Sequence, residues 1–289
     1  MSKPSLAYLN GQFVPIEQAH VSVLDRGFLF ADGVYEVVAV INGQLVDHGP
    51  HLRRLRRSLD ELQLESPVEF EQFPHLMEDL IRRESLQEGL VYLQITRGAD
   101  RNRDFPFPDP RQVPATLVMF VQEKTMVHSP VAQAGVRAIT IPVLRWRRRD
   151  IKSIALLPQV LGKQLAVRAG AGEAWMVEDG YVTEGTSSAV GIVIDETLVT
   201  RPISNDVLDS ITRRATLNLA AETSLTLVER RFTPAEAYQA SEAFMASATA
   251  LIMPIIEIDG HPLGDGKQGP YVRRFREIYL DIATSTRPV

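Results

Sequence analysis

The 289-residue sequence contains no cysteine, which excludes disulfides, thiolate catalysis and cysteine-based zinc or iron–sulfur sites. The six histidines are scattered without metal-ligand spacing, so we predict no metal site. The sequence also lacks the motifs Gly-x-Gly-x-x-Gly, Gly-Lys-Ser/Thr and Gly-x-Ser-x-Gly. Neither the common nucleotide-binding loops nor a serine hydrolase of the nucleophile-elbow type is indicated.

Long apolar runs are also missing. No stretch reaches the roughly 18 uninterrupted apolar residues that a membrane helix needs, and the N-terminus has no signal-peptide core. Basic residues number 31 and acidic residues 36, which gives a formal charge of −5. This weak acidity argues against a broad nucleic-acid interface. We therefore expect a soluble, cytoplasmic protein with no nucleic-acid or membrane partner.

The patterns that are present favour an α+β fold. Hairpin turns are indicated by dipeptides such as Asn10-Gly11, whereas Leu52, Leu55 and Leu59 recur at helical spacing. A prior of about 150 residues per domain predicts two domains. The predicted parts are an N-terminal domain at residues 1–122, a linker at 123–133 and a C-terminal domain at 134–289.

Two short segments carry candidate chemistry. Lys152 lies in a largely apolar stretch, and burial of an ammonium favours the neutral amine that forms Schiff bases. The alternative is a surface lysine on a strand edge. Glu184 lies among a glycine and four hydroxyl side chains, which indicates either a functional carboxylate or a polar hairpin turn. Each segment alone leaves both interpretations open.

Three further segments are equally ambiguous. Residues 209–213 begin a predicted helix, whose first amides either bind phosphate or are merely capped. Residues 25–36 contain closely spaced glycines around aromatic side chains, which indicates a constrained turn beneath a pocket. The basic run from Arg145 to Arg149 is a solvated loop, an anion site or an RNA contact.

Taken together and in this order, the segments resemble the class IV aminotransferases, the fold-type IV family that uses pyridoxal 5'-phosphate (PLP). The resemblance is greatest to D-amino-acid aminotransferases. It implies a smaller N-terminal α/β domain and a larger C-terminal domain with a barrel-like β core. The segments that carry it span nearly the whole chain: residues 25–36, 51–55, 92–98, 150–153, 182–185, 211–213 and 254–260.

The resemblance implies a role for each cofactor residue. Lys152 matches the lysine that forms a Schiff base with PLP and then moves the proton between substrate Cα and C4′. Glu184 matches the carboxylate on the pyridine nitrogen, where an ionised group keeps the nitrogen protonated. Arg54 matches the arginine on the phosphate. The remaining matches are the apolar support of the ring, Leu208, and the phosphate donors Ile211, Thr212, Ser247 and Ala248.

Substrate recognition is implied by a loop that the neighbouring subunit of a homodimer supplies. Tyr35 matches a tyrosine that helps to hold the substrate carboxylate, beside an Arg-x-His pair. The preferred register of the loop makes Arg103 the arginine and puts Phe105 where the histidine belongs; the other makes Arg101 the arginine and Arg103 the substitute for histidine. In both registers the histidine is missing. Without the resemblance, the same loop, with Arg97 added, indicates an anion-binding loop.

The activity implied is transamination between a D-amino acid, such as D-alanine or D-glutamate, and a 2-oxo acid. The alternatives are an L-branched-chain aminotransferase and, more distantly, an aminodeoxychorismate lyase, because these share several of the segments. A non-enzymatic alternative is an RNA-contacting protein that uses Arg145 to Arg149. The implied assembly is a homodimer, and the implied partners are small amino and 2-oxo acids.

Overall fold

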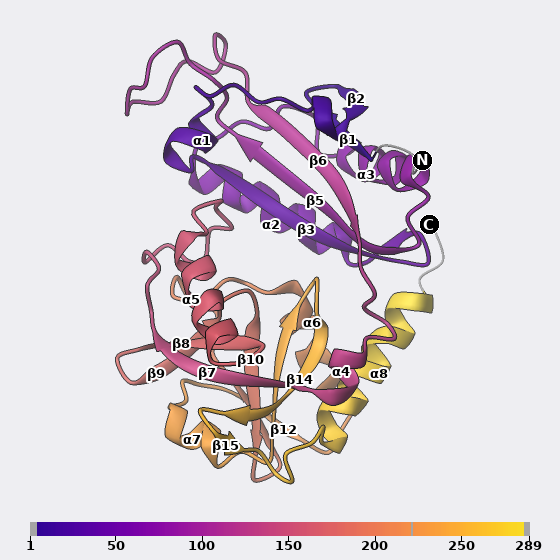
Figure 1. Ribbon diagram of the computed structural model, residues 1–289, viewed down its shortest axis with the longest axis vertical. Helices are drawn as coiled ribbons and strands as arrows, with labels where there is room; N and C mark the ends of the chain where they lie inside the picture. The colour runs from indigo at the N-terminus through magenta and orange to yellow at the C-terminus, as the bar shows by residue number, and fades with distance from the viewer. Residues whose placement is uncertain (1–4, 221, 286–289) are drawn as a thin grey trace. The chain divides into compact units, whose positions relative to one another are not determined.

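The computed structural model describes residues 5–220 and 222–285 (Figure 1). The chain forms two compact units, of which unit 1 contains the residues up to Thr125 and unit 2 most of those from Met126 onward. The exception is Ile151–Ala155, which belongs to unit 1 although the residues on both sides belong to unit 2. The chain therefore enters unit 1 a second time at the segment that contains Lys152.

Unit 1 is built on an antiparallel six-stranded sheet with the order β2-β1-β6-β5-β3-β4. The predicted Asn10-Gly11 turn joins β1 to β2 and is confirmed, with positive φ at both residues. The strands are β1 (Leu6–Leu9), β2 (Gln12–Pro15), β3 (Gly33–Ile41), β4 (Gln44–Leu45), β5 (Glu88–Thr96) and β6 (Thr116–Glu123).

Helices cover the core face of this sheet. The predicted leucine-spaced helix is confirmed as α2, which buries Leu55 and Leu59 against residues of β3 such as Val38. The opposite side of α2 is charged and exposed, as expected of an amphipathic helix. The helices of unit 1 are η1 (Ile16–Gln18), α1 (Arg26–Phe30), α2 (His48–Glu61) and α3 (Gln72–Glu84).

Unit 2 is built on a curled nine-stranded sheet, ordered β12-β11-β10-β13-β14-β7-β8-β9, with β15 paired to β14 (Figure 1). Parallel pairs join β11 to β12, β14 to β7 and β7 to β8, and the other pairs are antiparallel. The strands are β7 (Val136–Pro142), β8 (Glu173–Glu178), β9 (Tyr181–Gly185), β10 (Ala189–Ile194), β11 (Thr197–Thr200), β12 (Thr226–Glu229), β13 (Glu242–Ser247), β14 (Leu251–Ile258) and β15 (His261–Pro262).

Trp175, Phe232 and Ile192 pack in the buried core of unit 2. Helix α5 packs on β7 and β8, while α6 and α8 pack together against β13 and β14. The helices are α4 (Pro130–Ala134), α5 (Leu157–Arg168), α6 (Ile211–Ala220), α7 (Pro234–Tyr238) and α8 (Pro270–Ser285). Among the described residues, no helix has both the length and the apolar character needed to span a bilayer.

Candidate active site

The segment that contains Lys152 is held along β3 by backbone hydrogen bonds. The Tyr35 amide donates to the Lys152 carbonyl over 3.0 Å, and the Ile154 amide donates to the Gly33 carbonyl over 3.1 Å. The Lys152 amide donates to Ser58 Oγ of α2 over 3.2 Å. The Lys152 side chain is half-buried, and its Nζ lies 4.2 Å from the centre of the Tyr35 ring. Lys152 and Tyr35, two predicted site residues, are therefore neighbours within unit 1.

Tyr35 belongs to a row of aromatic rings that crosses neighbouring strands of the sheet. Tyr35 stacks on Tyr92 with centroids 5.7 Å apart, and Tyr92 stacks on Phe120 at 4.9 Å. Burial raises the pKa of Tyr92 to about 12, and the nearby Tyr35 hydroxyl acts in the same direction. Tyr92 consequently stays protonated and donates to Gln94 Oε1 over 2.8 Å. The Tyr35 ring is therefore packed at one end of a stacked aromatic row.

Arg54 belongs to a buried charged triad with Glu36 and His51. Its Nε and Nη2 donate to Glu36 Oε1 and Oε2, each over 2.8 Å, and His51 Nδ1 lies 2.8 Å from Glu36 Oε2. All three side chains are at least nine-tenths buried. Arg54 and His51 are three residues apart on α2 and share a face, while Glu36 projects from the core face of β3.

The electrostatics of this triad follow from its burial. Burial alone would raise the pKa of Glu36, but the Arg54 charge and the hydrogen bonds from Arg54 and His51 outweigh it and hold that pKa well below its ordinary range. Burial lowers the pKa of His51; Glu36 opposes this shift, whereas the charges of Arg54 and Lys152 reinforce it. At neutral pH the triad thus consists of an ionised pair and a neutral imidazole that donates through Nδ1.

A second charged network underlies the loop after β5. Arg97 donates to both oxygens of Asp32, over 2.9 and 3.0 Å, and to the carbonyls of Gln63 and Leu62. Arg26 donates from Nε to the same carboxylate over 2.8 Å. The pKa of Asp32 is lowered, because the hydrogen bonds and charges of the two arginines outweigh its burial. The expectation that Arg97 belongs to an anion-binding loop is wrong, since its guanidinium is buried and committed to Asp32.

The loop itself carries the predicted substrate residues. Arg26 holds it by donating to the carbonyls of Asp104 over 2.6 Å and Phe105 over 3.1 Å. Arg101 and Arg103 are exposed, and the Arg103 guanidinium lies 4.8 Å from the centre of the Phe30 ring. Phe105 packs on the same ring at 5.4 Å yet remains 77% exposed. The loop thus has a fixed base and a solvent-facing tip.

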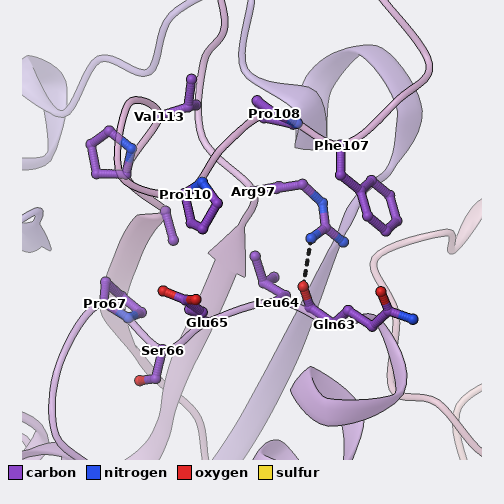
Figure 2. Close-up of a pocket in the computed structure, with 12 residues that line it drawn as sticks. Gln63, Leu64, Glu65, Ser66, Pro67, Arg97, Phe107, Pro108, Pro110 and Val113 are labelled. Atoms are coloured by element: carbon purple, nitrogen blue, oxygen red, sulfur yellow. Dashed lines mark hydrogen bonds between the residues drawn. The ribbon is translucent and has the colours of Figure 1, made fainter.

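A pocket of about 300 Å³ lies beside the base of this loop, lined by residues such as Gln63, Pro67, Pro110 and Val113 (Figure 2). Figure 2 shows the Arg97 guanidinium beside Phe107, donating to the Gln63 carbonyl over 2.9 Å. The predicted site residues of unit 1 do not line this pocket. We therefore assign it no part in the candidate active site.

In unit 2, Glu184 near the end of β9 is held on both carboxylate oxygens. Arg145 Nη1 forms an ion pair with Oε1, and the Leu208 amide donates to Oε2 over 3.0 Å. The Arg145 and Glu184 side chains are both more than nine-tenths buried. A buried carboxylate at Glu173 anchors the turn after β9, accepting a 2.8 Å hydrogen bond from Ser188 Oγ. Two predicted cofactor residues, Glu184 and Leu208, are therefore in contact.

The predicted phosphate donors of unit 2 lie at two chain turns. Ile211 and Thr212 begin α6, where the Ser210 hydroxyl accepts from the Arg213 amide over 3.2 Å. The first amides of a helix have no acceptor within it and are suited to bind an anion. Ser247 ends β13 and Ala248 follows; Ser247 Oγ accepts from the amide of residue 250 over 3.1 Å.

The basic run is largely committed to internal contacts. Arg149 is 1% exposed and donates to both Glu178 oxygens over 2.8 Å. Arg148 pairs with Asp150, and Arg145 pairs with Glu184. Arginines that are already paired with carboxylates contribute little to the binding of a phosphate backbone. The interpretation of the run as a solvated loop is wrong for Arg145 and Arg149, and the RNA-contact alternative loses its main support.

Four residues of these networks are missing from the candidates that the sequence indicates. Glu36 and His51 occur there only as parts of motifs, although the three-residue spacing of His51 and Arg54 places both on one helical face. Arg26 is part of a constrained turn, and Arg145 part of a charge run. No local signal links Arg145 to Glu184, 39 positions away. Across residues 5–220 and 222–285, no three His, Asp or Glu side chains are grouped to hold a metal ion.

Comparison with known proteins identifies the family. The model of the family "Amino-transferase class IV" matches residues 33–258. The D-alanine aminotransferase of Staphylococcus haemolyticus is 35% identical over 271 residues, which cover 93% of this chain and 95% of that protein. The chain is a class IV aminotransferase. The D-alanine aminotransferase of Listeria monocytogenes serotype 1/2a is 34% identical over 276 residues, covering 96% and 95% of the two chains.

Solved structures of class IV aminotransferases share the fold. The branched-chain amino acid aminotransferase of Thermoproteus uzoniensis with norvaline superposes with a TM-score of 0.85 at 27% identity, covering 96% of this chain and 94% of that one. The enzyme of Thermobaculum terrenum in its PLP-form gives a TM-score of 0.84 at 25% identity, covering 98% and 95%. The predictions of a fold-type IV architecture and of an aminotransferase are confirmed, as is PLP as the cofactor of the class.

Proposed function

We propose that this class IV aminotransferase transfers an amino group from a D-amino acid, D-alanine or D-glutamate in the first place, to a 2-oxo acid. The observation that carries the proposal is the chain-wide similarity, at 34–35% identity, to proteins named D-alanine aminotransferase. The domains predicted from the sequence are residues 1–122 and residues 134–289, joined by a linker at 123–133. They would be the small and the large domain of the enzyme.

The chemistry of the described residues fits PLP. An amine at Lys152, a buried guanidinium at Arg54 and a buried carboxylate at Glu184 match its aldehyde, phosphate and pyridine nitrogen. The amides of Ile211 and Thr212 at the start of α6 and the turn at Ser247 and Ala248 would add phosphate donors. The side chain of Leu208 would support the ring.

Each residue then has a defined task. PLP, when bound, supplies an aldehyde for Schiff-base chemistry and a ring that accepts electrons. Lys152 Nζ removes the proton from the substrate Cα and returns it to C4′. Glu184, held by Arg145 and the Leu208 amide, keeps the proton on the pyridine nitrogen. Tyr35, supported by its row of aromatic rings, binds the substrate carboxylate.

Amino donors provide the direct test of this function. Purified protein with PLP is given D-alanine or L-leucine together with 2-oxoglutarate, or D-glutamate together with pyruvate, and the 2-oxo acid formed from each donor is measured. We expect turnover of the D-donors and little of L-leucine. Turnover of L-leucine alone would instead support the second candidate, a branched-chain aminotransferase, which the similar solved structures favour. Release of pyruvate from aminodeoxychorismate would indicate the lyase.

The proposal includes that the protein forms a homodimer and is located in the cytoplasm. Unit 1 exposes large apolar side chains around the substrate loop, with Phe28 76% and Phe105 77% exposed. On α5 of unit 2, Leu157, Val160 and Leu161 are also half or more exposed. Apolar groups clustered on a surface favour burial against a partner. A second copy of the chain would cover them and would bring Arg103 or Arg101 to the neighbouring active site.

Mixed dimers test whether the loop is shared. Lys152→Ala and Arg103→Ala variants, each inactive alone, are mixed so that their subunits exchange. If the loop acts across the dimer, each mixed dimer contains one intact site, and about a quarter of the wild-type activity returns. The same mixture with Arg101→Ala decides the register. Failure of both mixtures to recover activity would contradict a shared loop, and full activity of a monomer would contradict the dimer.

A further inference from the structure

We propose that Glu36 and His51 are positioning residues, which orient the Arg54 guanidinium for the phosphate group of PLP. This inference rests on the proposed function of Arg54 as the phosphate arginine. Neither Glu36 nor His51 touches the reacting atoms in this proposal, and both act through Arg54.

The geometry of the triad is the first argument. Glu36 accepts two parallel hydrogen bonds of 2.8 Å from Nε and Nη2, which fixes the plane of the guanidinium. These bonds use two of the five N–H groups of an arginine side chain. A planar donor held in one orientation before the ligand arrives loses less conformational entropy on binding. Glu36 thereby prepares Arg54 to bind an anion.

The role of His51 follows from its charge state. Burial lowers the pKa of His51, so its neutral ring donates the Nδ1 proton to Glu36 at neutral pH. A neutral donor orients the carboxylate without competing with Arg54 for its charge. The His51 side chain is 4% exposed and packs one turn from Arg54 on the same helix. It therefore fixes the position of Glu36, which in turn fixes Arg54.

Charge alone predicts the opposite effect of Glu36 on phosphate binding. A carboxylate beside Arg54 cancels part of the positive potential that a phosphate would meet. Removal of the Glu36 charge would strengthen phosphate binding if potential dominated, and would weaken it if orientation dominated. The bidentate, buried arrangement favours orientation, and the two outcomes have opposite signs.

The experiment compares two ligands that differ only by the phosphate group. Apo-protein of wild type and Glu36→Gln is titrated with PLP and with pyridoxal, and each Kd is obtained from absorbance. We expect Glu36→Gln to weaken PLP binding about 10-fold, since a hydrogen bond to a charged group is lost, with little effect on pyridoxal. His51→Gln should also weaken PLP binding selectively, but by less. Glu36→Asp, which keeps the carboxylate, should bind PLP more tightly than Glu36→Gln and less tightly than the wild type.

Glu178→Gln is the matched control, because it breaks the bidentate pair with Arg149 in unit 2. It should lower the Tm without changing the ratio of PLP affinity to pyridoxal affinity. Equal or tighter PLP binding by Glu36→Gln, or equal weakening of both ligands, would overturn the inference. If Glu36→Gln does not fold, an unchanged ratio in both His51→Gln and Glu36→Asp is the overturning result. A wild type that fails to bind PLP would reject the proposed function itself.

Discussion

The two units each present a buried arginine–carboxylate pair, but the proposed roles within the pairs are exchanged. In unit 1, Arg54 is ion-paired with Glu36, and in the proposal Arg54 binds the ligand while Glu36 supports it. In unit 2, Glu184 is ion-paired with Arg145, and in the proposal Glu184 binds the ligand while Arg145 supports it. The exchange follows from ligand charge, because a phosphate requires a cation and a pyridinium requires an anion. In the proposal, the same kind of buried ion pair would therefore serve both the phosphate and the pyridine nitrogen of PLP.

The pairs also differ in what surrounds them. Glu36 is held by the side chains of Arg54 and His51, which come from a helix that packs on its own strand. The contacts of Glu184 include the Arg145 side chain and a backbone amide, that of Leu208. A backbone donor persists when any side chain is replaced. We therefore expect the unit 2 pair to keep its geometry better under mutation than the triad of unit 1.

The largest effect is expected from Glu184→Gln, which removes the charge of the unit 2 carboxylate. A neutral amide cannot hold the proton on the pyridine nitrogen, so the ring accepts electrons less well. We expect kcat to fall by about 10² to 10³-fold, typical of a lost electrostatic contact at the reacting centre. Steady-state rates with D-alanine and 2-oxoglutarate measure the change. Unchanged kcat would show that the carboxylate does not serve the ring nitrogen.

Replacement of the supporting arginine should have a smaller effect on the rate. Arg145→Met leaves Glu184 its Leu208 contact but removes the buried counter-charge, and we expect a loss of kcat of about 10-fold. The free energy of unfolding should fall by up to about 3 kcal/mol, because a buried charge loses its partner. Urea titration measures this change. A rate loss as large as that of Glu184→Gln would make Arg145 a direct participant and end the analogy with Glu36.

The smallest predicted effect concerns His51 and pH. Its pKa is lowered in the folded state mainly by burial, so below about pH 6.5 the unfolded chain binds a proton that the folded chain does not. The free energy of unfolding of the wild type therefore decreases as the pH falls below that value, by about 1.4 kcal/mol per unit of pKa difference.

His51→Gln removes this contribution to the pH dependence. Its free energy of unfolding should change less than that of the wild type between about pH 7.5 and about pH 5. Urea titrations at the two pH values give the comparison. Identical pH dependence in the two proteins would show that His51 titrates alike in both states, and that its environment in the triad is not the buried one described.

Local patterns in the sequence predicted the elements that local forces determine. The leucine spacing predicted α2, and the Asn10-Gly11 dipeptide predicted the first hairpin, because helical period and turn chemistry are properties of neighbouring residues. The similarity of Lys152, Glu184 and Arg54 to family motifs led to the class, which the comparisons confirm.

Local sequence patterns did not predict the contacts between residues that lie far apart in the chain. Nothing near Lys152 indicates that its segment joins the sheet of unit 1 through Tyr35, 117 positions earlier by their residue numbers. The ion pair of Arg145 with Glu184 and the burial of Arg97 against Asp32 are likewise products of tertiary packing. In each case the charge run or loop suggested exposed arginines, whereas the arginine is buried in an ion pair with a carboxylate that is distant in sequence. Partner choice among charges is set by the fold.

The most direct test of the account is the site of attachment of PLP. The holoprotein is reduced with borohydride, digested and analysed by mass spectrometry, with Lys152→Ala as the control. We expect a phosphopyridoxyl group on the peptide that contains Lys152, and no labelled peptide in the variant. Label on another lysine, or none on a protein incubated with excess PLP, would contradict the account.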